Sequence, residues 1–266
     1  MADGLLTVVL LAGAPAVASI VGGWLSLHHK PSTLLTSVVY GFAGGAMLGS
    51  VTLEMVPRGL DVVGLAWTAA ALIAGFASIY LFDLWMHGGR VAGEHAQQRR
   101  RVQVFKRHRE SVGSDAAVLA GATSLEEAVE GVTIGVAAVL DPALAVVVSL
   151  AVLINNLGEA TAIGEMFREE HKGRVAAARG PTLRWTGTIA VVMVGSALLA
   201  WLLLRDLPEA GLAMLVALGA GGLLYLTLSD LVPHAQQRHY QHSGALAGGA
   251  GFALILVVAG VAGAGH

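Results

Sequence analysis

The sequence of 266 residues contains no cysteine, and few of its side chains are charged. The chain therefore forms no disulfide, no thiolate metal site and no thiol nucleophile. Charged residues make up 13% of it, about half the share that soluble domains carry. Hydrophobic residues make up 55%, and the mean hydropathy is +0.70. Too few polar side chains remain to cover a surface that faces water, which excludes a soluble enzyme and predicts an integral membrane protein of one domain, residues 1–266.

Apolar runs long enough to cross a bilayer follow one another along the chain. A spanning helix needs roughly 20 mostly apolar residues. This criterion predicts an all-α integral membrane protein with eight transmembrane helices. The predicted spans are 5–27, 34–56, 64–86, 116–140, 143–167, 185–204, 210–232 and 244–264. The longest polar stretch is the loop 87–115, which includes the run Arg99-Arg100-Arg101.

Lys and Arg are distributed unequally between the two sides of the predicted bundle. The loops after the first, third, fifth and seventh spans hold all of them except Arg58 and Arg205. Cytoplasmic loops carry the excess of Lys and Arg in membrane proteins. We therefore expect a multi-pass protein of the cell (inner) membrane, with both termini on the extracellular or periplasmic side. The near balance of 16 basic and 18 acidic residues gives no indication of nucleic-acid binding, and the loop 87–115 is interpreted as a solvated cytoplasmic loop.

Two pairs of segments in the chain resemble each other. Residues 41–57 read GFAGGAMLGSVTLEMVP and residues 218–233 read LGAGGLLYLTLSDLVP, while 126–135 read EEAVEGVTIG and 155–164 read NNLGEATAIG. In each pair the two segments lie in spans predicted to run in opposite directions. Inverted repeats of this kind are typical of secondary transporters. We expect the first three spans to mirror the last three around a central pair, an inverted 3+2+3 repeat architecture.

Eight acidic residues fall inside the predicted spans, whose interiors hold no Lys or Arg. They are Glu54, Asp83, Glu126, Glu127, Glu130, Glu159, Glu165 and Asp230. An acidic residue at the centre of a spanning helix costs about 2.5–3.5 kcal/mol, so these side chains must face the bundle interior or water. For Asp83 and Glu165, near predicted cytoplasmic helix ends, a hydrogen-bonding or interfacial role is as good an interpretation as a functional one.

The middle of the fourth and fifth spans holds the densest polar group. We call it the Glu–Asn cluster; it comprises Glu126, Glu127, Glu130, Asn155, Asn156 and Glu159. Spacings of three and four residues put each trio on one helical face. Four carboxylates and two amides without a basic partner favour a bound cation. The alternative is a purely structural network of protonated acids.

Polar residues on either side of this cluster extend it into a predicted path across the membrane. Glu54 lies toward the outer end of the second span. Asp230 lies at the inner end of the seventh, followed in the adjoining loop by His234, His239 and His242. A histidine in a loop is ordinarily a solvated side chain, so the order of these residues across the membrane carries the prediction.

These residues resemble the ZIP (Zrt/Irt-like) family of divalent-metal transporters over nearly the whole chain. The family's fourth-span motif, His-Asn-x-x-(Glu/Asp)-Gly, is similar to residues 126–131, EEAVEG, and its fifth-span motif to residues 155–159, NNLGE. Its seventh-span and second-span patterns are similar to LYLTLSDLVP (224–233) and LEMVP (53–57). The resemblance implies eight spans, both ends outside, and transport of a divalent transition metal as substrate, with no cofactor and no catalysis.

The chain departs from the family pattern at its metal ligands. Glu126, Glu127 and Glu54 stand where the family has His, Asn and His, and Val129 and Gly158 stand where it has Pro. The span 185–204 contains no acid, although many bacterial members contribute a Glu there. Oxygen donors alone favour Mn²⁺, Fe²⁺ and Mg²⁺ over Zn²⁺, whereas the family favours Zn²⁺ and Fe²⁺. The predicted substrate is thus zinc, iron or manganese, with the choice left open.

Two other function classes compete with metal transport. A membrane-embedded enzyme could use Glu126 and Glu130, but the Pro-Gly phosphate cradle, the Arg that intramembrane proteases need at position 131, and a His-Glu-x-x-His motif are all missing. A carrier or sensor for something other than a metal is supported by the missing histidines. Gly- and Ala-rich span faces permit a homodimer.

Overall fold

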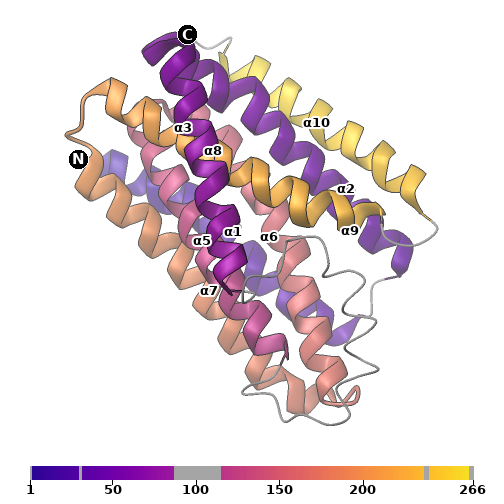
Figure 1. Cartoon of the computed structure of the whole chain (residues 1–266). Coiled ribbons are helices and arrows are strands. Elements are labelled where there is room, and N and C mark those ends of the chain that lie inside the picture. The colour runs from indigo at the N-terminus through magenta and orange to yellow at the C-terminus, as the bar shows by residue number, and fades with distance from the viewer. Residues whose placement is uncertain (1, 30–31, 87–114, 237–239, 264–266) are drawn as a thin grey trace.

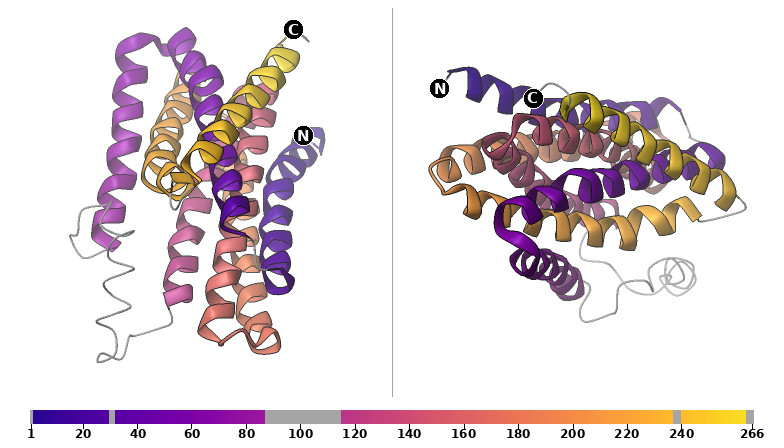
Figure 2. Two further views of the ribbon diagram at one scale, coloured as in Figure 1. Left: turned by 90° about the vertical axis from the view of Figure 1, so that its right-hand side faces the viewer. Right: turned by 90° about the horizontal axis from the view of Figure 1, so that it is seen from above.

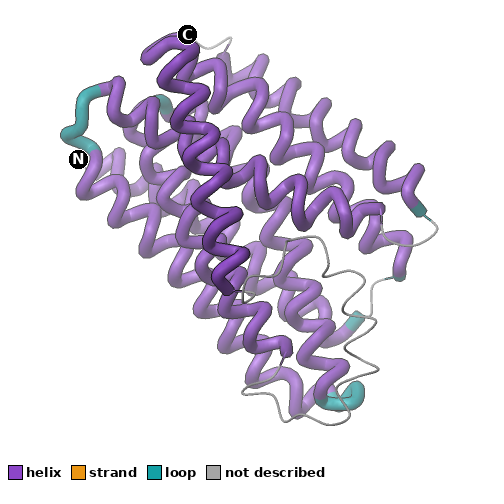
Figure 3. Tube along the Cα trace, in the orientation of Figure 1, coloured by secondary structure: helices purple, strands orange, loops and turns teal. Residues whose placement is uncertain are grey.

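The structure is a computed structural model that describes residues 2–29, 32–86, 115–236 and 240–263. Within these ranges the chain is helical and forms no strand (Figure 3). The predicted loop 87–115, except its last residue, and His239 lie outside the described residues.

The described helices follow one another in chain order. They are α1 (Ala2–His28), α2 (Thr33–Ser50), η1 (Val51–Met55), α3 (Val56–Met86), α5 (Asp115–Leu140), α6 (Pro142–Glu170), α7 (Val175–Leu204), α8 (Glu209–Leu226), η3 (Thr227–Leu231), α9 (Val232–Gln236) and α10 (Gln241–Gly263) (Figure 1). The segments η1 and η3 are single π-helical turns inside longer helical runs. The N-terminal end of α1 and the C-terminal end of α10 lie toward the same end of the bundle.

Six helical segments of the described chain are long and apolar enough to cross a membrane. They are Gly4–His28, Thr33–Leu84, Pro142–Glu170, Val175–Leu204, Glu209–Gln236 and Gln241–Ala262. The helix α5 has sufficient length, but its three central glutamates make it too polar by the same criterion. The protein is therefore a multi-pass helical membrane protein, and the number of eight spans stays a prediction.

The longest of these segments, Thr33–Leu84, folds back on itself. Gly64 adopts φ 77° and ψ 174°, a backbone conformation that residues with a β-carbon rarely adopt. A β-carbon placed on Gly59 would lie 2.8 Å from the side chain of Thr68, whereas nine residues of straight helix span about 13 Å. Figure 2 (left) shows the chain reversing direction there, which puts α3 at one edge of the bundle and α1 at the opposite edge. The predicted spans 34–56 and 64–86 thus correspond to the two arms of this run.

Local sequence signals set the turn between the two central helices. Asp141 separates α5 from α6, and its Oδ1 atom accepts a hydrogen bond from the backbone N–H of Ala143 at 2.8 Å. This N-cap satisfies one of the free N–H groups at the start of α6. Pro142 follows as the first residue of α6, a position where its missing N–H costs nothing. The connection is short, so α5 and α6 lie next to each other with opposite directions.

Both π turns share a local cause. In η1 the N–H of Val56 bonds to the carbonyl of Val51, and in η3 the N–H of Val232 bonds to that of Thr227, five residues back in each case. A proline follows each of these valines, Pro57 in the first case and Pro233 in the second. Because proline has no N–H and its ring crowds the preceding turn, the helix widens there.

The helices pack as a central pair flanked by equivalent neighbours. The pair α5 and α6 is covered on one side by α7 and α1, where α7 packs against α5 and α1 against α6. On the other side α8 contacts α5 and α2 contacts α6, while α3 packs on α8 and α10 on α2. The last contact is so close that a β-carbon on Gly45 would collide with the backbone carbonyl of Gly248. Small residues permit such approach between membrane helices.

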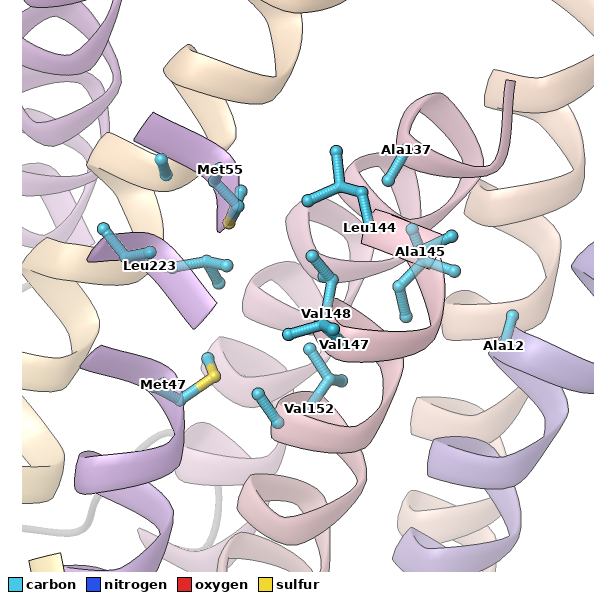
Figure 4. Close-up of a cluster of buried hydrophobic side chains, with 14 of the residues drawn as sticks. Ala12, Met47, Met55, Ala137, Leu144, Ala145, Val147, Val148, Val152 and Leu223 are labelled. Atoms are coloured by element: carbon cyan, nitrogen blue, oxygen red, sulfur yellow. The ribbon is translucent and has the colours of Figure 1, made fainter. Parts of the chain in front are cut away.

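The apolar core extends through most of the described helices, and one part of it lies between α2, η1, α6 and α8. Met47, Met55, Val148, Val152 and Leu223 are among its members (Figure 4), and each is at most 1% exposed. Methionine fills irregular gaps between helices, such as those beside a π turn. This core holds α6, and with it half of the Glu–Asn cluster, in a fixed place.

Candidate metal centre

The two central helices bury most of the Glu–Asn cluster. Glu127 and Glu130 on α5 are 1% exposed, and Asn155 and Asn156 on α6 are 3% and 0% exposed. Glu126 and Glu159 are half-buried. Buried acids without partners would be very costly, so the contacts among these side chains decide what the arrangement can do.

A single amide group joins two of the carboxylates. The Nδ2 atom of Asn155 donates to Oε1 of Glu159 at 2.8 Å and to Oε1 of Glu130 at 3.2 Å. Glu130 and Glu159 occupy equivalent positions in the two sequence repeats, and the structure brings them to the same amide from opposite helices.

A second amide holds a third carboxylate in the same way. The Nδ2 atom of Asn156 donates to Oε2 of Glu127 at 2.8 Å, and both side chains are fully buried. The cluster therefore contains two Glu–Asn sets, one of three residues and one of two. Each set is built across the α5–α6 interface.

Four oxygen atoms of these two sets are buried without a hydrogen-bond partner. They are Oε1 of Glu127, Oε2 of Glu130, Oδ1 of Asn155 and Oδ1 of Asn156. All four are acceptors: two are carboxylate oxygens and two are amide oxygens. The N–H groups of both amides already donate to the carboxylates. Buried polar atoms are almost always paired in folded proteins. The cluster thus has an excess of acceptors that a cation or a proton donor would satisfy.

The carboxylates do not by themselves surround one point. The described residues form no group of three or more His, Asp or Glu side chains close enough to hold a metal ion. The amides lie between the acids and keep them apart. An ion bound here would need amide oxygens as well as carboxylate oxygens.

Glu126 connects the cluster to the inner part of the predicted path. Its carboxylate is within electrostatic range of Asp83 on α3, Asp230 on η3, and Glu130 and Glu159 of the cluster. Since these groups come from four different elements, the bundle collects negative charge around Glu126.

Asp230 and His234 form a pair next to this region. The Nδ1 atom of His234 lies 3.1 Å from Oδ1 of Asp230, and the imidazole stacks on the ring of Tyr40 with centroids 5.0 Å apart. Asp230 and His234 both act electrostatically on Glu159. The prediction that the histidines lie in a loop was wrong for two of them, because His234 belongs to α9 and His242 to α10. The apolar criterion ended the seventh span too early and began the eighth too late.

Glu54 lies apart from the cluster. It sits in η1, and the charge that acts on it is that of Asp141, the N-cap of α6. The described part of the chain records no contact between Glu54 and the six cluster residues. Four residues further on, Nη2 of Arg58 forms an ion pair with Oε1 of Glu209 at 3.1 Å.

Sequence reasoning gave no role to Tyr225, Asp141 and Arg58. Tyr225 donates a hydrogen bond to Oδ2 of Asp83, linking α8 to α3. The charge of Asp141 acts on Glu54, and Arg58 pairs with Glu209. No local pattern points to the Tyr225–Asp83 contact. Arg58 could have been found by extending the first repeat by one residue, where it aligns with His234. Glu165, on α6, is half-buried and away from the cluster contacts.

Comparison with known proteins gives one consistent set of relatives. No family model matches the chain. The zinc transporters ZupT of Salmonella paratyphi A, Salmonella newport and Salmonella enteritidis are each 30% identical to it over 238 residues. The alignment covers 87% of this chain and 86% of each relative.

Proposed function

The chain belongs to the ZIP family of metal transporters, and from this premise we propose that it carries divalent transition-metal ions through the Glu–Asn cluster. It is a membrane transporter and not an enzyme. The relatives are named for zinc, so Zn²⁺ is one proposed substrate, and Fe²⁺ and Mn²⁺ are the others.

The four buried oxygens without partners carry this proposal. Two belong to carboxylates and two to amides, and all of them can only accept. Carboxylate and amide oxygens are ligands that hard and borderline divalent ions take. We propose that the amide N–H groups of Asn155 and Asn156 hold the acids apart when no ion is present. A bound ion replaces these contacts, and each amide then turns its oxygen toward the ion.

Oxygen donors set the proposed order of preference among metals. The cluster offers neither imidazole nor thiolate, the ligands that favour Zn²⁺ and copper. The imidazole of His234 acts electrostatically on Glu159. We therefore propose that Mn²⁺ and Fe²⁺ are carried at least as well as Zn²⁺.

We propose a topology of eight spans built as an inverted repeat. The two arms of Thr33–Leu84 and the helix α5 add to the other five apolar segments. Exchanging α1, α2 and α3 with α7, α8 and α10, and α5 with α6, turns each main helix contact into another that is also present, which supports the repeat. The equivalent π turns, each with a carboxylate and a following proline, support it as well.

The proposed path runs from Glu54 through the cluster to Asp230 and His234. The electrostatic connection of Glu126 and Glu159 to Asp230 supports the inner half of this path. The excess of Lys and Arg after odd-numbered spans supports a cytoplasmic position for that half.

Uptake into proteoliposomes tests the function. Purified protein is reconstituted, and entry of Zn²⁺, Mn²⁺, Fe²⁺ and Mg²⁺ is measured against protein-free vesicles. We expect saturable uptake of the three transition metals, with Mn²⁺ and Fe²⁺ at least equal to Zn²⁺. Folded protein that admits none of these ions would refute metal transport, and uptake of Zn²⁺ alone would refute the order derived from oxygen donors.

A further inference from the structure

The two π turns carry a matching acid and base. Residues 54–58 read Glu-Met-Val-Pro-Arg and residues 230–234 read Asp-Leu-Val-Pro-His. In both, the carboxylate lies in the π turn and the base follows the proline directly. The same backbone feature thus presents an acid and, four residues later, a basic side chain at each proposed mouth of the path.

In the second of these segments the base contacts the residue that carries the acid. Nδ1 of His234 lies 2.8 Å from the backbone carbonyl oxygen of Asp230 and 3.1 Å from its Oδ1 atom. A base four residues after the acid can therefore reach it across a π turn of this kind. The arginine side chain is longer than that of histidine, so Arg58 has the reach to contact Glu54 in the equivalent way.

In the first segment Arg58 points elsewhere. Its Nη2 atom bonds to Oε1 of Glu209 at 3.1 Å, from the first turn of α8. The Nε atom of Arg58 is buried and has no acceptor, so the guanidinium keeps an unsatisfied donor. Within the described part of the chain Glu54 has no ion-pair partner, and the charge near it is the negative one of Asp141.

We propose that Glu209 is a positioning residue that holds Arg58 away from Glu54 and so keeps this carboxylate open to an incoming cation. This rests on the proposed function, because Glu54 matters only if cations enter past it. An arginine beside Glu54 would block it at every physiological pH, since the guanidinium does not lose its proton. Glu209, with a side chain 63% exposed, competes for the guanidinium from outside the path.

Removing the competitor is expected to weaken ion capture without slowing passage. In Glu209→Gln the guanidinium loses its charged partner and turns to Glu54. The attraction between opposite unit charges about 4 Å apart in water-like surroundings changes a binding constant by roughly a factor of five. We therefore expect the KM for metal uptake to rise about fivefold or more, while the maximal rate per folded transporter changes by less than twofold.

A double variant separates this effect from loss of structure. Arg58→Gln alone should leave KM at or below the wild-type value, and Arg58→Gln combined with Glu209→Gln should return KM to within about twofold of wild type. Asp61→Asn is the matched control, because Asp61 is an exposed acid three residues after Arg58, and its KM should not change. Thermal melting of each variant reports folding.

The experiment uses Mn²⁺ and Zn²⁺ uptake by the full chain in proteoliposomes. A KM raised by Glu209→Gln and restored in the double variant supports the positioning role. A KM unchanged by Glu209→Gln, or one that stays high in the double variant, overturns it. Absence of uptake by the wild-type protein would instead overturn the proposed function, so the two failures are distinguishable.

Discussion

Replacing Glu159 by Gln removes one negative charge from the cluster and little else. Gln has the same length, and its side-chain oxygen can accept the hydrogen bond that Asn155 donates to Glu159 at 2.8 Å. The equivalent change at Glu130 keeps the 3.2 Å contact in the same way. Both variants should therefore fold, and any loss of uptake reports the lost charge.

The size of the effect follows from the burial of these groups. Two unit charges 4 Å apart attract by about 4 kcal/mol at an effective dielectric constant of 20, and a divalent ion doubles this to about 8 kcal/mol. Loss of hydration offsets most of the attraction. If a quarter remains, about 2 kcal/mol, the loss of affinity is roughly thirtyfold, at 1.36 kcal/mol per factor of ten.

The assay compares Glu130→Gln and Glu159→Gln with wild type in metal binding and in uptake. Glu169→Gln serves as the control, because Glu169 is an exposed acid near the end of α6. We expect both cluster variants to lose at least tenfold in affinity and to transport almost nothing. Uptake within about twofold of wild type for both, at normal expression, would refute the reasoning and favour protonated acids with a structural role.

Three further outcomes are expected. Metal affinity should fall as the pH is lowered from about 7.5 to 5.5, because protons and metal compete for the same carboxylates; a dissociation constant that stays flat over this range in calorimetry would contradict a carboxylate site. Asn155→Ala removes the amide shared by Glu130 and Glu159 and should lower the free energy of unfolding by about 1.5–3 kcal/mol, seen as a lower melting temperature, whereas an unchanged melting temperature would show that the amide does not hold the acids. Gly45→Val should collide with α10 and reduce the yield of folded protein, while Gly249→Val, which meets nothing within 4 Å, should not; equal yields on size-exclusion chromatography would argue against the close α2–α10 contact.

Much of the fold was predictable because membrane helices are defined by long apolar runs. The predicted span 143–167 lies within α6, Pro142–Glu170, and the start of α6 is fixed by a local cap. The prediction was less accurate where a helix continues beyond the apolar segment. Helix α7 begins at Val175 instead of 185, since its 30 residues span about 45 Å, more than the hydrocarbon core of about 30 Å. The break predicted between the spans 34–56 and 64–86 corresponds to the reversal at Gly64, where the backbone leaves the helical conformation.

The candidate site was predictable only in part, for a related reason. Spacings of three and four residues predicted the two halves of the Glu–Asn cluster, because each half lies on a single helix. The contacts Tyr225–Asp83 and Arg58–Glu209 join residues more than 140 positions apart, and no local pattern encodes them. The π turns were not predicted either, since a helical period of 3.6 residues assumes that no turn is widened.

The two π turns make the length of these stretches of chain critical. A π turn holds one more residue than the α-helical turn it replaces, and each residue of an α-helix rotates the chain by about 100°. Deleting one residue from Val51–Met55 or Thr227–Leu231 would let the turn close as a regular α-helical turn, so the chain beyond it would keep its orientation. The widened turn in which Glu54 or Asp230 lies would be lost. A further single-residue insertion, by contrast, would rotate everything beyond it by about 100° and give Arg58 or His234 different neighbours, so insertions should be the changes that these segments tolerate least.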